Sequence, residues 1–90
     1  MGEIENYREK LEQIRKEIDK IDDNIVDLLN NRGELVLKIG KIKKEHNLKT
    51  KQSNREIEIM KRIQSRSTFY KKSISAIWKK IIKASRKIQG

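Results

Sequence analysis

The apolar residues in the first half of the chain recur at alternating steps of three and four. One track reads Ile4, Leu11, Ile18, Ile25, Arg32 and Ile39, and the other reads Tyr7, Ile14, Ile21, Leu28, Leu35 and Ile42. This heptad spacing is typical of a helix that packs along a seam against another helix. It predicts one helix over residues 3–45, about 60 Å long at a rise of about 1.5 Å per residue. A compact domain of 90 residues is much shorter, so we expect something equally long to pack beside it.

A second, shorter helix is predicted after the apolar pattern lapses in the stretch HNLKTKQ. Ser53 followed three residues later by Glu56 has the form of a capping box, in which the two side chains bond backbone N–H groups at a helix start. We therefore expect a helix over residues 53–65. Its inward positions are expected to be Ile57, Met60 and Ile63.

The polar stretch QSRST ends the second helix, and Ser67 or Thr68 can cap a third helix over residues 68–89. The buried stripe of this helix is expected to contain Tyr70, Ile74, Ile77, Trp78, Ile81, Ile82, Ser85 and Ile88. The sequence thus predicts a single all-α domain over residues 1–90, with one very long helix and two shorter ones.

Composition narrows the chemistry that the chain can perform. It contains no Cys and a single His, His46, so disulfides and thiolate nucleophiles are excluded and we expect no metal site. No window approaches the roughly 18 uninterrupted apolar residues of a membrane span, and the first residues lack an apolar segment of signal-peptide length. We expect a cytosolic protein that does not bind a membrane.

Charge is distributed unevenly along the chain, whose formal net charge is +10. Residues 1–30 carry nine acidic and five basic side chains, whereas residues 31–90 carry four acidic and 18 basic ones. Such a basic surface attracts anions, which include nucleic acid, anionic lipid and small acidic metabolites. Net charge does not choose among them. Many of the basic side chains are interpreted as ordinary solvated groups, among them Arg8, Arg62, Arg66 and Arg86.

Arg32 interrupts the heptad seam and needs an anionic partner, because an unpaired buried charge costs several kcal/mol. An ion pair with an acidic side chain of this chain or of a second subunit would meet that need. Lys43 supports another interpretation, since it lies eleven residues further along the same helix face, about 16 Å away, with Val36 and Ile39 between. Two cationic arms over an apolar floor suit a small anionic metabolite.

Arg15 lies beside the seam, seventeen residues or about 25 Å from Arg32 on the same helix. One small ligand cannot span that distance. If both arginines serve one site, one of them must come from the long helix of a second copy that runs antiparallel. The site would then lie between two subunits, and a symmetric dimer would contain two such sites.

The run LEQIRKEIDKIDDNIVDLLNNRGELVLKIGKIK, followed by NREIEIMKRI and IIKASRKIQ, resembles the all-helical class of chorismate mutases over nearly the whole chain. The spacing of Arg15, Arg32, Lys43 and the adjacent Arg55 and Glu56 follows the family pattern without gaps. The resemblance implies an intertwined, domain-swapped homodimer with two pockets. It also implies the rearrangement of the dianion chorismate to prephenate, with no cofactor and no metal.

The resemblance assigns catalytic roles by position. Arg15 of the partner subunit and Arg32 clamp the substrate carboxylates, and Lys43 and Gln89 donate hydrogen bonds to the ether oxygen. A [3,3] shift needs no nucleophile and no proton transfer, but it does need a substrate held in its reactive shape and cations aimed at the oxygen that gains charge. A neutral amide such as that of Gln89 can donate at any ordinary pH.

Further residues are assigned to substrate binding by the same resemblance. Glu56 receives the ring hydroxyl, Arg55 positions charged groups, and Ser85 contacts a carboxylate. Gln52 stands where the family usually has an acidic residue that meets the hydroxyl, and an amide accepts that bond more weakly. The apolar walls are formed by Ile39, Ile59 and Ile82. The link between the second and third helices is about three residues shorter than in typical members, which leaves the register of Ser85 and Gln89 open.

Each assignment competes with other interpretations of the sequence. Glu56 can serve only the capping box, and Gln89 is penultimate, where helices fray. An isochorismate pyruvate lyase shares the fold and much of the pocket, although Lys43, Glu56 and Gln89 together favour the mutase. A non-enzymatic helical module would bind nucleic acid through its basic part. The paucity of aromatic residues and the acidic first third argue against that, so we expect no nucleic-acid partner.

Overall fold

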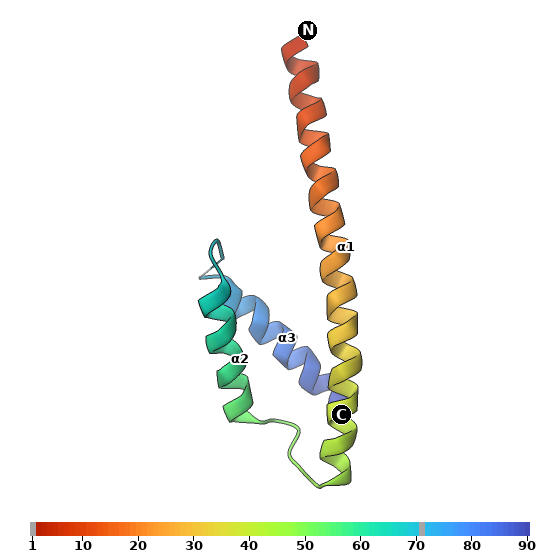
Figure 1. The fold of residues 1–90 in the computed structure, drawn as a ribbon, viewed down its shortest axis with the longest axis vertical. Coiled ribbons are helices and arrows are strands. Elements are labelled where there is room, and N and C mark those ends of the chain that lie inside the picture. The colour runs from red at the N-terminus through yellow and green to blue at the C-terminus, as the bar shows by residue number, and fades with distance from the viewer. Residues whose placement is uncertain (1, 71) are drawn as a thin grey trace. The chain divides into compact units, whose positions relative to one another are not determined.

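The computed structural model of the chain describes residues 2–70 and 72–90, with side chains from Asn6 onward. The described residues form three α-helices, α1 (Gly2–Glu45), α2 (Ser53–Arg66) and α3 (Ile74–Gln89) (Figure 1). This part of the chain contains no strand, which confirms the predicted all-α class. Ile4, the first position of the predicted seam, lies outside the described side chains.

The chain divides into two compact units, Met1–Arg32 and Gly33–Gly90, and α1 contributes residues to both. The first unit is the N-terminal part of α1. Apart from the half-buried Leu11, the described apolar side chains on its heptad seam are exposed, from 48% for Ile25 to 65% for Leu28. The seam predicted to pack against another helix is therefore uncovered in the single chain.

The unit Gly33–Gly90 has a small apolar core. Among the described residues, its buried apolar side chains are Val36 from α1, Ile59 from α2 and Ile82 from α3. Burying one aliphatic side chain contributes about 1.5–3 kcal/mol, so a core of this size gives the unit only modest stability. Each of the three helices supplies one of these buried residues.

α1 ends through a backbone conformation that only a few residue types tolerate. Asn47 has a φ of 55° in the left-handed region, where Asn and Gly are favoured. The N–H of His46 donates to the carbonyl of Ile42 at 3.1 Å, and that of Leu48 donates to the carbonyl of Lys43 at 2.8 Å. These bonds satisfy carbonyl groups of the last turn and direct the chain toward α2.

α2 begins at Ser53, as predicted, and ends one residue later than expected, at Arg66. The predicted capping box is wrong, because the N-cap residue is Gln52 and no side chain caps the helix. Ser53 is already inside the first turn, so its hydroxyl lies one position too late to act as the cap. Glu56 donates its backbone N–H to the carbonyl of Gln52 at 3.1 Å, and its carboxylate turns toward α3 instead.

α3 begins at Ile74, six residues later than the predicted start at residue 68. Ser67 does not open α3, because its backbone is extended and its N–H closes α2 by donating to the carbonyl of Ile63 at 3.2 Å. The chain reverses through a turn in which the N–H of Ser73 donates to the carbonyl of Tyr70 at 2.9 Å. α2 and α3 then pack against each other, and Gln64 Nε2 donates to Ser75 Oγ at 2.7 Å near the turn.

The predicted inward faces of α2 and α3 are correct only in part. Ile82 is buried, and Met60, Ile63, Ile74, Trp78, Ile81 and Ser85 are half-buried. Four predicted inward residues are exposed in the single chain, namely Ile57, Tyr70, Ile77 and Ile88. Tyr70 precedes α3 and belongs to the turn, so it cannot share the face of that helix. The others stand at the margins of faces wider than one small unit can cover.

Candidate functional site

Lys43 joins three segments of the unit Gly33–Gly90. It is half-buried near the end of α1, and its Nζ donates to Gln89 Oε1 at 2.8 Å and to the backbone carbonyl of Thr50 at 2.6 Å. The first bond reaches α3, and the second reaches the loop before α2. An ammonium group has three N–H donors, so one remains for a ligand.

Gln89 is buried although it is the penultimate residue, with only 9% of its surface exposed. Its Nε2 donates to the backbone carbonyl of Ser85 at 3.2 Å, while its Oε1 accepts from Lys43. An ammonium group can only donate, which fixes the orientation of the amide. The second N–H of Nε2 is left to donate elsewhere. The last turn of α3 is thus tied to α1 through this side chain.

Gly40 makes the close approach of α3 to α1 feasible at Gln89. A Cβ atom at this position would lie 3.1 Å from Gln89 Cγ and 3.3 Å from its Cα. Contacts that short are tighter than ordinary van der Waals packing. The absence of a side chain at residue 40 therefore lets the end of α3 reach the distance at which Gln89 meets Lys43.

Ser85 lies one turn before Gln89 on α3 and is half-buried. Its Oγ donates to the backbone carbonyl of Ile81 at 2.8 Å, within the same helix. Ser85 and Gln89 occupy neighbouring positions on one face of α3, as their spacing of four residues requires.

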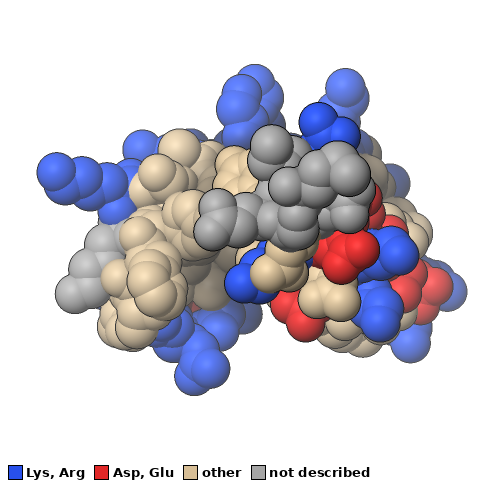
Figure 2. Space-filling view, turned by 90° about the horizontal axis from the view of Figure 1, so that it is seen from above, with Lys and Arg blue, Asp and Glu red and all other residues tan. Residues whose placement is uncertain are grey.

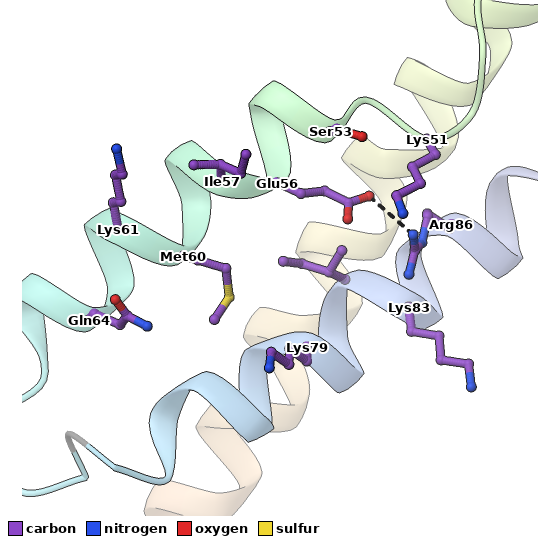
Figure 3. A pocket seen from close by; sticks show the side chains of 11 residues that line it. Lys51, Ser53, Glu56, Ile57, Met60, Lys61, Gln64, Lys79, Lys83 and Arg86 are labelled. Carbon is purple, nitrogen blue, oxygen red and sulfur yellow. Dashed lines mark ion pairs between the residues drawn. The ribbon is translucent and has the colours of Figure 1, made fainter.

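Glu56 and Arg86 form an ion pair between α2 and α3, with 3.5 Å between Oε2 and Nη1. The two side chains keep only 23% and 33% of their surface exposed. The pair lies in a groove of about 550 Å³ between the two helices (Figure 3). The sequence interpretation of Arg86 as a solvated side chain is therefore wrong, since this residue contacts α2 rather than water alone.

The groove carries a strongly basic lining over an apolar floor. Its residues are Lys51, Ser53, Glu56, Ile57, Met60, Lys61, Gln64, Lys79, Ile82, Lys83 and Arg86. Five of these eleven side chains are basic and one is acidic. More widely, residues 33–90 contain 17 Lys and Arg but four acidic residues. Lys and Arg side chains extend outward from the surface in the view of Figure 2.

Arg55 and Gln52 make local contacts at the start of α2. Arg55 Nη1 lies 3.3 Å from Glu58 Oε2 on the same helix, and both side chains are mostly exposed. Gln52 is exposed as well, and its Nε2 donates to the backbone carbonyl of Lys49 at 2.8 Å. Both predicted site residues thus lie on the surface and engage their own segment of the chain.

The predicted apolar wall residues divide into two groups. Ile59 and Ile82 are buried in the core of the unit Gly33–Gly90, whereas Ile39 is 49% exposed. Ile82 also lines the groove that holds the Glu56–Arg86 pair. The core of this unit and the groove therefore share one aliphatic side chain of α3.

The remaining two predicted site residues belong to the unit Met1–Arg32. Arg15 is exposed, and its Nη1 lies 3.2 Å from Oε1 of Glu12, one turn earlier on α1. Arg32 is half-buried at the last position of that unit. Interactions of exposed pairs such as Arg15 and Glu12 contribute little to stability, so Arg15 can exchange its partner at small cost.

Sequence reasoning missed two groups near the predicted site residues, the Arg86 side chain and the Thr50 carbonyl. Both lie in contacts between segments distant in sequence, namely Arg86 with Glu56 and Thr50 with Lys43. No local spacing signals such contacts. The position of Arg86, between Ser85 and Gln89 on a packed helix, was the one available hint.

Metal and membrane features are absent from the described part of the chain. Residues 2–70 and 72–90 hold no cluster of three or more His, Cys, Asp or Glu side chains that could bind a metal ion. Over the same residues, each helix is too short or too polar to cross a bilayer.

Comparison with solved structures gives a close match in fold. A conserved hypothetical protein from Pyrococcus furiosus superposes with a TM-score of 0.77 at 40% sequence identity, which covers 90% of this chain and 96% of that one. A likeness at this identity and coverage indicates the same fold over almost the entire length of both chains.

Two curated relatives match a shorter part of the chain. The bifunctional chorismate mutase/prephenate dehydratase of Aquifex aeolicus (strain VF5) is 47% identical over 55 residues. The T-protein of Haemophilus influenzae is 36% identical over 55 residues. Each match covers 61% of this chain and 15% of the relative, so the chain spans a small part of either protein's length.

The family model described as chorismate mutase type II matches residues 14–90. This match includes every residue proposed for the site, and the chain belongs to the chorismate mutase type II family.

Proposed function

We propose that this chain catalyses the rearrangement of chorismate to prephenate, without a cofactor. The observation that carries the proposal is the hydrogen bond between the half-buried Lys43 and the buried Gln89, whose Nζ and Oε1 atoms are 2.8 Å apart. The family assigns these two positions to the ether oxygen of the substrate. In this chain both side chains are held in place by the protein and both retain an N–H that is free to donate.

In the proposed mechanism the protein supplies position and charge only. The C–O bond of the ether breaks while a C–C bond forms at the other end of the substrate, and no proton moves. Negative charge builds up on the ether oxygen, where Lys43 and Gln89 donate hydrogen bonds. Because these donors are already oriented before the substrate arrives, they stabilise the transition state without reorganising. Holding the flexible substrate in its folded conformer removes a further entropic part of the barrier.

The substrate carboxylates are proposed to be bound by Arg32 and by Arg15 of the partner subunit, with Ser85 and Arg55 assisting. Glu56 and Gln52 would receive the ring hydroxyl, and Ile39, Ile59 and Ile82 would form the apolar walls. An intertwined homodimer accounts for the contribution of Arg15. The exposure of the heptad seam in the unit Met1–Arg32 supports this assembly, since a second copy would cover it. A cytosolic location stays a prediction.

The name of the Aquifex aeolicus relative, which includes chorismate mutase, supports the mutase over the isochorismate pyruvate lyase. Two assays on the purified chain separate these activities, namely prephenate formation from chorismate and pyruvate release from isochorismate. We expect the first product and not the second. Pyruvate release without prephenate formation would refute the proposed function.

Lys43→Ala tests the residue on which the proposal depends. We expect kcat/KM for chorismate to fall at least about a hundredfold, the usual cost of removing an oriented donor from a developing oxyanion. The matched control is Lys41→Ala, which removes an exposed lysine from the same helix and should leave turnover nearly unchanged. Circular dichroism should show the same helix content in both variants. Equal activity of the two variants would contradict the assignment.

A further inference from the structure

The Glu56–Arg86 pair differs from the other ion pairs described in this chain. Arg15–Glu12 and Arg55–Glu58 each join residues three apart on one helix, and their side chains are 62–68% exposed. The Glu56–Arg86 pair instead joins α2 to α3, and its side chains are only 23% and 33% exposed. Partial burial strengthens an ion pair and lowers its sensitivity to salt. The geometry of the Glu56–Arg86 pair is therefore better defined than that of the two exposed pairs.

We infer that Arg86 is a positioning residue, which orients the Glu56 carboxylate to receive the ring hydroxyl of the substrate. The inference rests on the proposed function, in which Glu56 binds that hydroxyl. In the pair, Nη1 of Arg86 lies against Oε2 of Glu56 at 3.5 Å. The second carboxylate oxygen, Oε1, remains to accept a hydrogen bond. Arg86 thus acts through Glu56 and does not itself contact the substrate.

The place of Arg86 on α3 connects the two halves of the proposed site. Gln89 ties the last turn of this helix to Lys43 of α1, and Arg86 ties the same turn to Glu56 of α2. Residues 86 and 89 are three apart, so one turn of helix carries both contacts. A single rigid segment therefore sets the position of the ether-oxygen donor and that of the hydroxyl acceptor.

The other cations of the groove cannot replace Arg86 without moving the carboxylate. Lys51, Lys61, Lys79 and Lys83 also line the groove, and all four are exposed (Figure 3). A lysine is a point charge on a flexible stem, whereas the planar guanidinium holds a carboxylate in a fixed direction. In the absence of Arg86, Glu56 would turn toward one of these ammonium groups. Its free oxygen would then no longer lie where the hydroxyl needs it.

A double-mutant cycle on the full-length chain tests this inference. The variants are Arg86→Gln, Glu56→Gln and the double variant, with Lys83→Gln as the control for loss of one positive charge from the same groove. We expect Arg86→Gln to raise KM for chorismate about tenfold and to change kcat less than about twofold. The hydroxyl takes no part in the bond that breaks or in the bond that forms, so its recognition is expected to affect the ground state and the transition state alike. Lys83→Gln should change neither constant.

The decisive expectation is that Arg86→Gln causes no further loss in the Glu56→Gln background, because the two residues act as one unit. Arg86→Lys should reverse part of the rise in KM, since lysine keeps the positive charge but lacks the planar guanidinium group. Thermal melting of all variants detects a loss of folding. If Arg86→Gln unfolds at a lower temperature than the wild type, Arg86→Lys takes its place in the comparison with Glu56→Gln.

Three results would overturn the inference while leaving the proposed function intact. The first is an additive loss in the double variant, and the second is an unchanged KM in a folded Arg86→Gln variant. The third is a fall in kcat as large as the rise in KM. Additive losses would mean that Arg86 contacts the substrate directly. A wild-type chain that does not convert chorismate would instead overturn the proposed function, and this inference with it.

Discussion

The two units of the chain carry equally clear apolar patterns but use them differently. In Gly33–Gly90 the pattern produces a core, in which Val36, Ile59 and Ile82 are buried, and Gln89 is buried as well. In Met1–Arg32 the pattern is more regular, yet the apolar side chains of its seam that the structure describes are exposed apart from the half-buried Leu11. A chain can bury an apolar face only against another face, and the first unit is one stretch of helix. The regularity of a heptad pattern thus indicates packing without saying which chain supplies the partner.

The difference also separates the two kinds of proposed site residue. Lys43, Gln89, Glu56 and Arg86 are held by contacts inside the unit Gly33–Gly90. Arg15 has an exposed ion pair with its helix neighbour Glu12. The proposed homodimer explains this contrast, because a side chain that serves another subunit gains its fixed surroundings only on assembly.

The largest effect is expected from a charge placed in the exposed seam. Ile21→Asp would put a carboxylate at the centre of the proposed interface, where an unpaired charge is costly. We expect the dimer to weaken by more than about 3 kcal/mol, or over a hundredfold in its dissociation constant, and the activity to be lost with it. Sedimentation measures the first and the chorismate assay the second.

The control for the seam variant is Lys16→Asp, which introduces the same side chain on the opposite, polar face of the helix. It should leave assembly and activity close to wild type. If Ile21→Asp remains a fully active dimer, or if the wild type is an active monomer, the seam does not serve the proposed assembly.

Mixing two inactive variants sharpens the comparison between the units. Arg15→Ala damages the side chain proposed to serve the partner, and Lys43→Ala damages a side chain that serves its own subunit. After subunit exchange, half of the dimers are mixed, and each of these contains one site with both residues intact. We expect about a quarter of wild-type activity in an equimolar mixture. No recovery after verified exchange would exclude a site shared between subunits.

A smaller effect is expected from the glycines of α1 in the unit Gly33–Gly90. Gly40→Ala gains helix propensity of about 1 kcal/mol, but its Cβ would lie within 3.1–3.3 Å of three atoms of Gln89. We expect the end of α3 to shift and kcat/KM to fall about tenfold, since a displaced donor loses much of its effect.

Gly33→Ala is the matched control for this change. Its Cβ would meet the nearest atom, Ile88 Cδ1, at 3.8 Å, an ordinary packing distance. It should raise the free energy of unfolding by up to about 1 kcal/mol without loss of activity, as measured by urea denaturation and the chorismate assay. Equal activity in both variants would show that Gln89 tolerates displacement.

Local pattern in the sequence determined the number of helices, the bounds of α1 and α2 within one residue, and the residues that resemble the family site. The helices and their bounds follow from the repeat of apolar side chains at 3.6-residue spacing within each of the three segments, whereas the site residues depend on the resemblance to the family. The capping residues were predicted wrongly at both shorter helices. A serine can cap a helix or sit inside its first turn, and the surrounding packing decides between the two.

Only the tertiary structure decided which face each helix buries and which polar groups meet. The start of α3 at Ile74 follows from the turn that lets it return along α2. The burial of Gln89 depends on the space at Gly40, 49 residues earlier in the chain. Arg86 meets Glu56 because the two helices pack against each other. Contacts of this kind are set by the packing of distant segments, and the period of a single helix holds no information about them.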